Sequence, residues 1–130
     1  MKHSYQLFVF IAIFPLLSLK MKAQAPNITS VTPVSTVVEQ YGKFEVRVNL
    51  TAGYTNPYDY DNIRISAVFT GPNGQSKTVD GFFMQEFQFS NPQTGALTAI
   101  GSGVFKIRFA PDQEGTWTYV VSCTNVQGSA

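Results

Sequence analysis

The stretch Phe105–Tyr119 reads FKIRFAPDQEGTWTY. Its two acidic residues, Asp112 and Glu114, are either a catalytic pair or part of a corner that joins two strands. Its first five residues alternate between apolar and basic side chains, which predicts a strand with one face in the core and one in water. We expect the side chains of Phe105, Ile107 and Phe109 to point into the core, and those of Lys106 and Arg108 to face solvent.

The second half of the stretch predicts a corner and a further strand. The chain from Pro111 to Gly115 is rich in residue types that form turns, and acidic side chains there accept backbone N–H bonds or stay solvated. We therefore interpret Asp112 and Glu114 as part of the corner, with no catalytic role. Four residues are the structural markers, and we expect the tryptophan to lie near the centre of the domain: Pro111, Gly115, Trp117 and Tyr119.

The rest of the chain repeats this two-residue period. Clear alternation is found in Phe44–Thr51, Ile63–Thr70 and Trp117–Cys123, and weaker strands are expected at Ile28–Val34, Gln75–Val79 and Phe82–Phe89. No segment keeps an apolar period near 3.6, so no long helix is expected. Short strands with one apolar face must be covered by a second sheet. The sequence thus predicts an all-β antiparallel sandwich of about seven strands.

The N-terminus has the pattern of an export signal. Leu7–Leu19 is almost wholly apolar, is shorter than the roughly 20 residues of a membrane span, and is followed by a small residue at Ala23. We predict a signal peptide over residues 1–23, a domain over 24–124 and a linker or truncated tail over 125–130. The expected location is secreted, periplasmic or cell-surface. An uncleaved anchor is the alternative, because Lys20 and Lys22 flank the apolar core.

Charge and residue supply exclude several function classes. Nine basic and eight acidic residues are nearly balanced, and without the three lysines of the leader six basic residues face eight acidic ones. This argues against a nucleic-acid surface, which needs clustered Lys and Arg. The one histidine, His3, falls in the leader, so the mature domain has no Ser-His-Asp or Cys-His system and no zinc site built on histidine.

Carboxylate chemistry remains as the route to catalysis, and we predict that it is not used. The sequence gives no sign of an enclosed cleft around the six candidate carboxylates, which are Asp59, Asp61, Asp80, Glu86, Asp112 and Glu114. No cofactor and no metal are expected. Calcium at the oxygen-rich segment Asn56–Asn62 is the alternative. Cys123 is in phase with the apolar side of its strand and is predicted to be buried, the alternative being a reactive thiol or an intermolecular bridge.

Aromatic residues are the remaining resource for binding. Tyr54, Tyr58 and Tyr60 crowd one segment and are candidate glycan-stacking residues, because flat rings can stack on sugar faces. A second group comprises Phe82, Phe83, Phe87 and Phe89. The alternation of Phe87 and Phe89 with Gln88 favours a buried strand face over an exposed one.

Several short motifs occur in an order that resembles a known family. These are Asn56-Pro57-Tyr58, Phe69–Gly74, Val79–Phe83, Phe105–Pro111 and Gly115–Tyr119. The sequence resembles an uncharacterised family of secreted immunoglobulin-like β-sandwich domains found N-terminal to bacterial glycoside hydrolase (β/α)8 barrels. The segment Met84–Ser102 is longer than the matching link in that family, and we expect an extra hairpin or a protruding loop there.

The resemblance implies a function without catalysis. It implies a non-catalytic accessory domain of a secreted carbohydrate-degrading system, which packs against or spaces a catalytic barrel in cis or in trans. Two alternatives stay open: a glycan-binding module that uses exposed aromatics on a polysaccharide, and a generic cell-surface protein-interaction sandwich. None of the three readings makes the domain an enzyme, a nucleic-acid binder or, after signal cleavage, a membrane protein.

Overall fold

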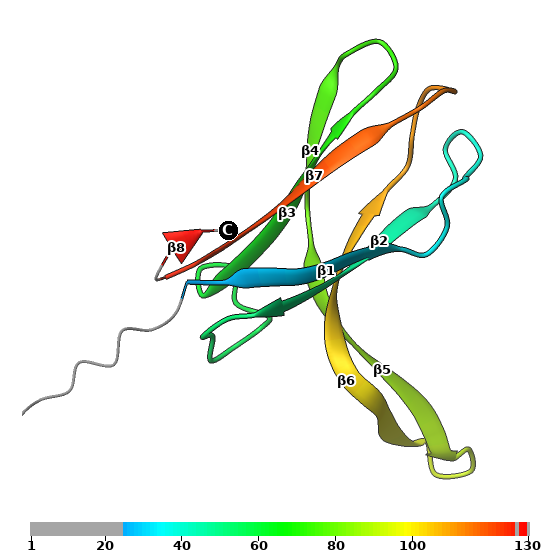
Figure 1. Cartoon of the computed structure of the whole chain (residues 1–130). Coiled ribbons are helices and arrows are strands. Elements are labelled where there is room, and N and C mark those ends of the chain that lie inside the picture. Colours follow the sequence, from blue (N-terminus) through cyan, green and yellow to red (C-terminus); the bar gives the residue numbers. More distant parts are fainter. Residues whose placement is uncertain (1–24, 127, 130) are drawn as a thin grey trace, which may run out of the picture.

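The computed structural model describes residues 25–126 and 128–129, and it forms two packed antiparallel sheets without a helix in this part of the chain (Figure 1). One sheet has the order β1-β2-β6-β5, and its strands are Asn27–Pro33, Phe44–Thr51, Ala96–Phe109 and Phe82–Asn91. The other has the order β4-β3-β7-β8, with strands Ser76–Asp80, Ile63–Thr70, Thr118–Asn125 and Gly128–Ser129. The prediction of an all-β antiparallel sandwich is confirmed.

The strand order is that of an immunoglobulin-like sandwich. If the strands are lettered A, B, C, C′, D, E, F and G along the chain, the two sheets are A-B-E-D and C′-C-F-G. Seven of these described strands have five residues or more, and β8 has two. The predicted strands 44–51 and 63–70 coincide with β2 and β3, because alternation there is regular and both strands lie at the centre of a sheet.

The core lies between the two inner strands of each sheet. In one sheet Val46 pairs with Ile107, and in the other Ile65 pairs with Cys123. Directly opposite residues on a sheet face pack against one another, so these pairs form layers of the core. The buried apolar residues are Val46, Val48, Ile63, Ile65, Ala67, Phe69, Phe105, Ile107 and Cys123.

The expectation that Lys106 faces water is wrong, whereas Arg108 keeps 42% of its side chain exposed. Lys106 is only 3% exposed although it lies on the outer face of β6. Its backbone neighbours on either side are Arg47 and Phe82, and its Nζ is 2.9 Å from Glu86 Oε1. Alternation predicts the face of a strand but not how crowded that face is, and here long neighbouring side chains cover the lysine.

The expected central position of Trp117 is also wrong. Trp117 is half-buried and precedes the first residue of β7. Its ring packs on Phe109 at 4.9 Å between centroids, and its Nε1 donates to the Gln113 carbonyl at 3.0 Å. An indole N–H needs an acceptor when it leaves water, and the corner supplies one where the apolar core has none.

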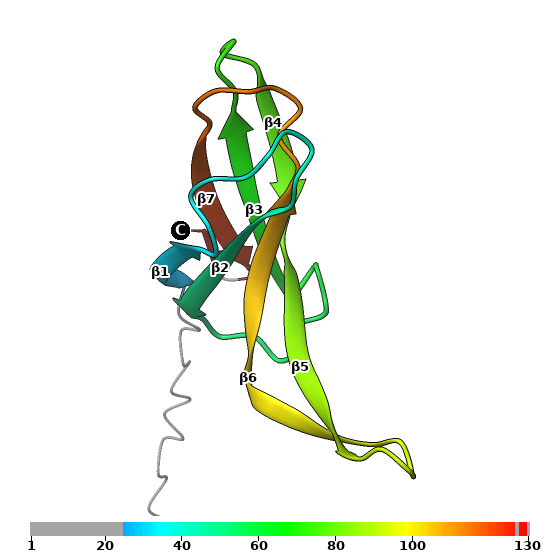
Figure 2. The same ribbon diagram turned by 90° about the vertical axis from the view of Figure 1, so that its right-hand side faces the viewer.

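Strands β5 and β6 form a hairpin that runs on past the rest of the sandwich (Figures 1 and 2). The two strands stay paired from Phe82 opposite Lys106 to Asn91 opposite Ala96, with an irregularity near Gly101, where φ is +60°. The segment Met84–Ser102 is thus the distal part of a long hairpin. We call this segment the arm.

Two expectations concern parts of the chain that the structure does not test. The predicted signal peptide, residues 1–23, lies outside the described residues. The boundaries of the domain and tail stay predictions, although Gly128 and Ser129 pair with the end of β7. No helix long and apolar enough to cross a membrane occurs within residues 25–126 and 128–129.

Candidate functional site

Three of the six candidate carboxylates, Asp80, Glu86 and Asp112, have structural partners. Asp112 binds Lys77 Nζ, and that hydrogen bond holds the pKa of Asp112 below its ordinary value. Lys106 likewise hydrogen-bonds Glu86 and lowers its pKa. Asp80 accepts a hydrogen bond from Tyr60, and this raises the pKa of the tyrosine. These contacts tie strands and loops together.

The segment Asn56–Asn62 uses its side-chain oxygens within its own turns. Asn56 Oδ1 accepts from the Tyr58 amide, and Asp59 Oδ1 accepts from the Asp61 amide, both at 3.0 Å. Asn62 Oδ1 accepts from Thr55 at 2.9 Å. Over the part of the chain that the structure describes, no group of three His, Cys, Asp or Glu side chains is placed to hold a metal ion.

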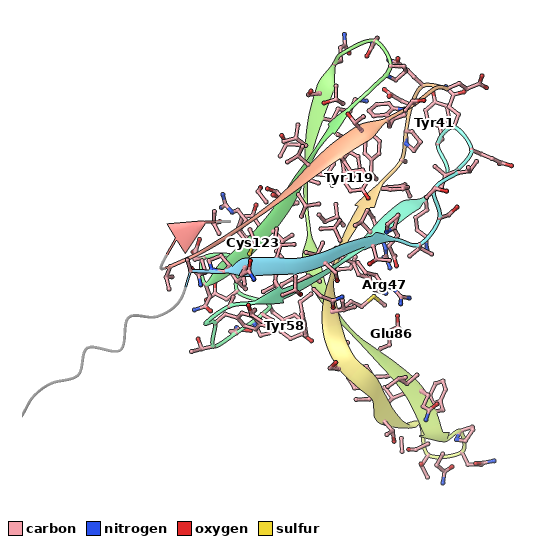
Figure 3. The ribbon with its side chains drawn as sticks, viewed as in Figure 1. Tyr41, Arg47, Tyr58, Glu86, Tyr119 and Cys123 are labelled. Atoms are coloured by element: carbon pink, nitrogen blue, oxygen red, sulfur yellow. The ribbon has the colours of Figure 1, made fainter. Side chains whose placement is uncertain are left out.

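The three candidate glycan-stacking tyrosines have different surroundings. Tyr54 is half-buried with its ring 5.8 Å from Phe105. Tyr60 lies under the guanidinium of Arg64, at 3.9 Å. Tyr58 is 67% exposed and lies in the loop between β2 and β3 (Figure 3). Tyr58 is therefore the most open of the three, and their stacking role stays a prediction.

Beside Tyr58 and Tyr60 there is a shallow recess. Its volume is about 140 Å³, and Phe83 forms part of its wall, 5.2 Å from the Tyr58 ring. Ligand pockets commonly measure about 300–1,000 Å³. The recess is too small to enclose a ligand of that size, so binding there would depend on the exposed ring.

A larger pocket opens between the two sheets at the end that carries Tyr41 and Tyr119 (Figure 3). Its volume is about 670 Å³, within the range of ligand pockets. We call it the intersheet pocket. Five aromatic rings form its floor, and they are Phe44, Phe69, Phe109, Trp117 and Tyr119.

The floor of the intersheet pocket is one connected cluster of rings. Phe69 and Phe109 stack at 4.2 Å with 10° between their planes. Phe44 and Tyr119 each lie within 6.0 Å of Phe69, and Trp117 packs on Phe109. Each ring of the floor therefore packs against at least one other ring.

Two loops wall the pocket and are bonded to each other. The Tyr41 amide donates to the Pro111 carbonyl at 2.7 Å, and Gln40 Nε2 donates to the Asp112 carbonyl at 2.7 Å. Tyr41 has φ +60°, an unusual value for a bulky residue that the surrounding bonds maintain. The corner of the opening stretch therefore forms one wall of the pocket, to which Glu114, Gly115 and Trp117 contribute.

The arm carries the second candidate surface. The prediction that Phe87 and Phe89 are buried is wrong, since they are 54% and 65% exposed. They lie on the same face of β5 as the core residue Phe83, and Phe89 is directly opposite Leu97. The core-facing side of the sheet continues onto the arm, but the second sheet ends before it and leaves this side uncovered (Figure 2).

A charged cluster lies on the other side, at the base of the arm. Arg47 and Glu86 are close together in the angle between β2 and the arm (Figure 3). Glu45 bridges Lys106 and Arg108 at 3.5 and 2.7 Å. Burial pushes the pKa of Glu45 upward, but its bonds and attraction to the two cations outweigh this and lower it.

Cys123 belongs to the core. It is buried, its thiol is free, and burial raises the pKa of that thiol. A thiol in such surroundings stays protonated and unreactive. The prediction of a small buried apolar residue is confirmed.

Comparison with known proteins gives one match. A family model described as a domain of unknown function (DUF5060) matches residues 37–124, which include β2 to β6, all of β7 but its last residue, the arm and most of the lining of the intersheet pocket. Neither the curated proteins nor the solved structures contain a match to this chain.

Proposed function

Starting from the fact that the chain belongs to the family of the domain of unknown function DUF5060, we propose that it is a non-catalytic accessory domain that docks on a catalytic module. The carbohydrate-degrading, secreted setting of the proposal comes from the resemblance of the short motifs and from the leader sequence. The docking itself is argued from the arm.

The observation that carries the proposal is the uncovered apolar side of the arm. Phe87, Phe89 and Leu97 are each more than half exposed and lie on one side of the hairpin. Alternation puts polar side chains such as Gln88 and Thr98 on the other side. An exposed apolar patch of this kind, with a largely polar opposite face, is typical of a surface that a partner covers.

The scarcity of charge on the arm favours a partner with an apolar surface. No charged residue occurs from Phe87 to Phe105, so the arm beyond Glu86 offers no group for an ion pair. The charged cluster lies at its base, on the opposite side. A partner that fits has an apolar, uncharged patch of its own, as the outer surface of a folded module has, and the contact is driven by burial of apolar area.

The remaining residues support a role without chemistry. The sole histidine, His3, lies in the predicted leader. Three acidic residues, Glu45, Glu86 and Asp112, form ion pairs with Lys106, Arg108 or Lys77. A domain with few free catalytic groups would act through its placement, either by packing on the catalytic barrel or by holding it at a distance.

The test is association with the glycoside hydrolase module encoded in the same or an adjacent reading frame. The two parts are mixed and their association is measured by calorimetry, for the wild type and for the variants Leu97→Ser and Ile100→Ser. The two positions are matched, because both side chains are exposed and aliphatic, at 57% and 46%, but they lie on opposite faces of the arm.

We expect Leu97→Ser to weaken association at least tenfold and Ile100→Ser to leave it within about twofold, since a side chain at the centre of an interface contributes roughly 1–2 kcal/mol or more. Equal effects of the two variants would place the contact elsewhere. Absence of any carbohydrate-active module from the neighbouring frames would remove the proposed setting.

A further inference from the structure

We propose that the intersheet pocket is a binding site for a neutral saccharide, with one face of a sugar ring on the aromatic floor and its hydroxyls on the polar rim. The proposal rests on the pocket alone and not on the arm. The two lie at opposite ends of the domain, as the positions of Tyr41 and Tyr119 relative to Glu86 show (Figure 3).

The size and floor of the pocket fit a small cyclic ligand. About 670 Å³ is enough for a ligand of one or a few rings. Trp117 and Tyr119 are only half-buried although both pack on other rings, so part of each ring faces the pocket. Flat apolar rings favour a ligand with a flat apolar face, and the C–H faces of sugar rings have this shape.

The rim excludes an anionic ligand. The charged side chains that line the pocket are Glu39 and Glu114, and neither Lys nor Arg is among the lining residues. A phosphate or a uronic acid would meet two carboxylates and no cation, which is unfavourable in a partly desolvated site. The ligand class is therefore neutral or cationic.

The kind of polar group on the rim favours a neutral ligand over a cationic one. The amide of Gln113 and the hydroxyls of Thr36 and Thr116 line the pocket, and each of these groups can both donate and accept a hydrogen bond. Sugar hydroxyls also donate and accept, so they can use all of these groups. A purely apolar ligand would leave them unpaired, and an ammonium group could use only the acceptors.

The site is formed before a ligand arrives. The loop containing Gln40 and Tyr41 is bonded to the corner through the Asp112 and Pro111 carbonyls, both at 2.7 Å. Trp117 is held at its Nε1 by the Gln113 carbonyl and at its ring by contact with Phe109. Binding then requires little ordering of the protein, which favours affinity for a small ligand.

The chain's single tryptophan, Trp117, lines this pocket, so its fluorescence provides a local reporter of binding there. The full chain is titrated with neutral oligosaccharides based on glucose, xylose, mannose and galactose. Oligogalacturonate serves as the anionic comparison and a lysine-containing tripeptide as the cationic one. The same titrations are run on Gln113→Ala and, as the matched control, on Gln93→Ala at the tip of the arm.

We expect a saturable fluorescence change with at least one neutral class, none with oligogalacturonate, and an affinity about tenfold weaker in Gln113→Ala, which is the loss of one hydrogen bond. Gln93→Ala should bind as the wild type does. The proposal is overturned if no neutral oligosaccharide gives a saturable change up to roughly 10 mM. It is also overturned if only the peptide binds, if the acidic sugar binds equally, or if both variants lose affinity alike. Failure here leaves the docking of the arm untouched, because Leu97→Ser and Ile100→Ser probe a different surface.

Discussion

Replacement of Gly103 by alanine tests how the arm is joined to the domain. A Cβ at this position would lie 2.1 Å from Cζ of Phe83, because the outer end of the Phe83 ring lies against the glycine. That ring also contacts Tyr58 at 5.2 Å and Phe105 at 5.1 Å between centroids. The added methyl group therefore forces the ring away from both aromatic partners.

The size of the effect follows from these contacts. Each aromatic pair contributes about 0.5–1.5 kcal/mol beyond its buried area, so displacement of Phe83 costs about 1–3 kcal/mol. Alanine restricts the unfolded chain more than glycine does, which returns about 0.4–1 kcal/mol. We expect Gly103→Ala to lower the free energy of unfolding by about 1–2 kcal/mol.

The assay is urea unfolding followed by circular dichroism, with the midpoint and the slope compared between variants. Gly53→Ala is the matched control, since a Cβ at Gly53 meets nothing within 4 Å. It should be neutral or slightly stabilising. In a Phe83→Leu background, which lacks the ring atoms that the methyl group would meet, Gly103→Ala should also become neutral or stabilising.

The decisive comparison is the effect of Gly103→Ala on the free energy of unfolding in the wild-type and the Phe83→Leu backgrounds. If Gly103→Ala costs the same with Phe83 and with leucine there, the ring does not rest on the glycine and the reasoning fails. A neutral Gly103→Ala in the wild-type background would refute it equally. If the ring does rest there, then the glycine, the ring and Tyr58 together join the arm to the rest of the sandwich.

Three further outcomes are expected. Trp117→Ala should lower the free energy of unfolding by about 2–3 kcal/mol, below the roughly 3–5 kcal/mol of a fully buried ring, because Trp117 is half-buried; a loss under about 1 kcal/mol in urea unfolding would contradict this. Cys123 should react with a thiol reagent only at the rate of unfolding, since it is buried with a raised pKa; fast labelling of the native protein would place it at the surface. Lys106 lowers the pKa of Glu86, so the ionised carboxylate stabilises the fold above the ordinary pKa of about 4.3, and this contribution is lost as the pH falls through the folded-state pKa. The difference in urea midpoint between wild type and Glu86→Gln should therefore be present at pH 7 and shrink as the pH falls through the lowered folded-state pKa. A difference that grows on acidification would reverse the assigned sign.

Local patterns predicted most of the architecture because a strand's faces are set by a two-residue period. Val46 and Val48, like Ile63 and Ile65, occupy the core positions that alternation assigns them. The corner after Phe109 followed from its turn residues for the same reason. These properties depend on neighbours in the chain, and a single sequence contains them in full.

Three features could not be obtained in that way. Phe87 and Phe89 alternate as core residues do, but whether a second sheet covers them depends on where that sheet ends. Lys106 has the pattern of a wet-face residue, but its cover comes from side chains on adjacent strands. The intersheet pocket joins segments near residues 33–44, 69 and 109–119, which no local pattern relates.

The sequence by itself thus determined the strands, their apolar faces, the absence of histidine from the domain and the free cysteine. Only the tertiary structure decided which apolar residues stay exposed on the arm and which aromatic rings gather in a pocket. The physical reason is that alternation and turn propensity are properties of adjacent residues, whereas burial depends on what lies across the sheet-to-sheet space. The stretch Phe105–Tyr119 shows both kinds of property. Its corner could be predicted from the sequence, whereas its tryptophan forms a pocket only when Phe44, Phe69 and the loop before β2 are packed around it.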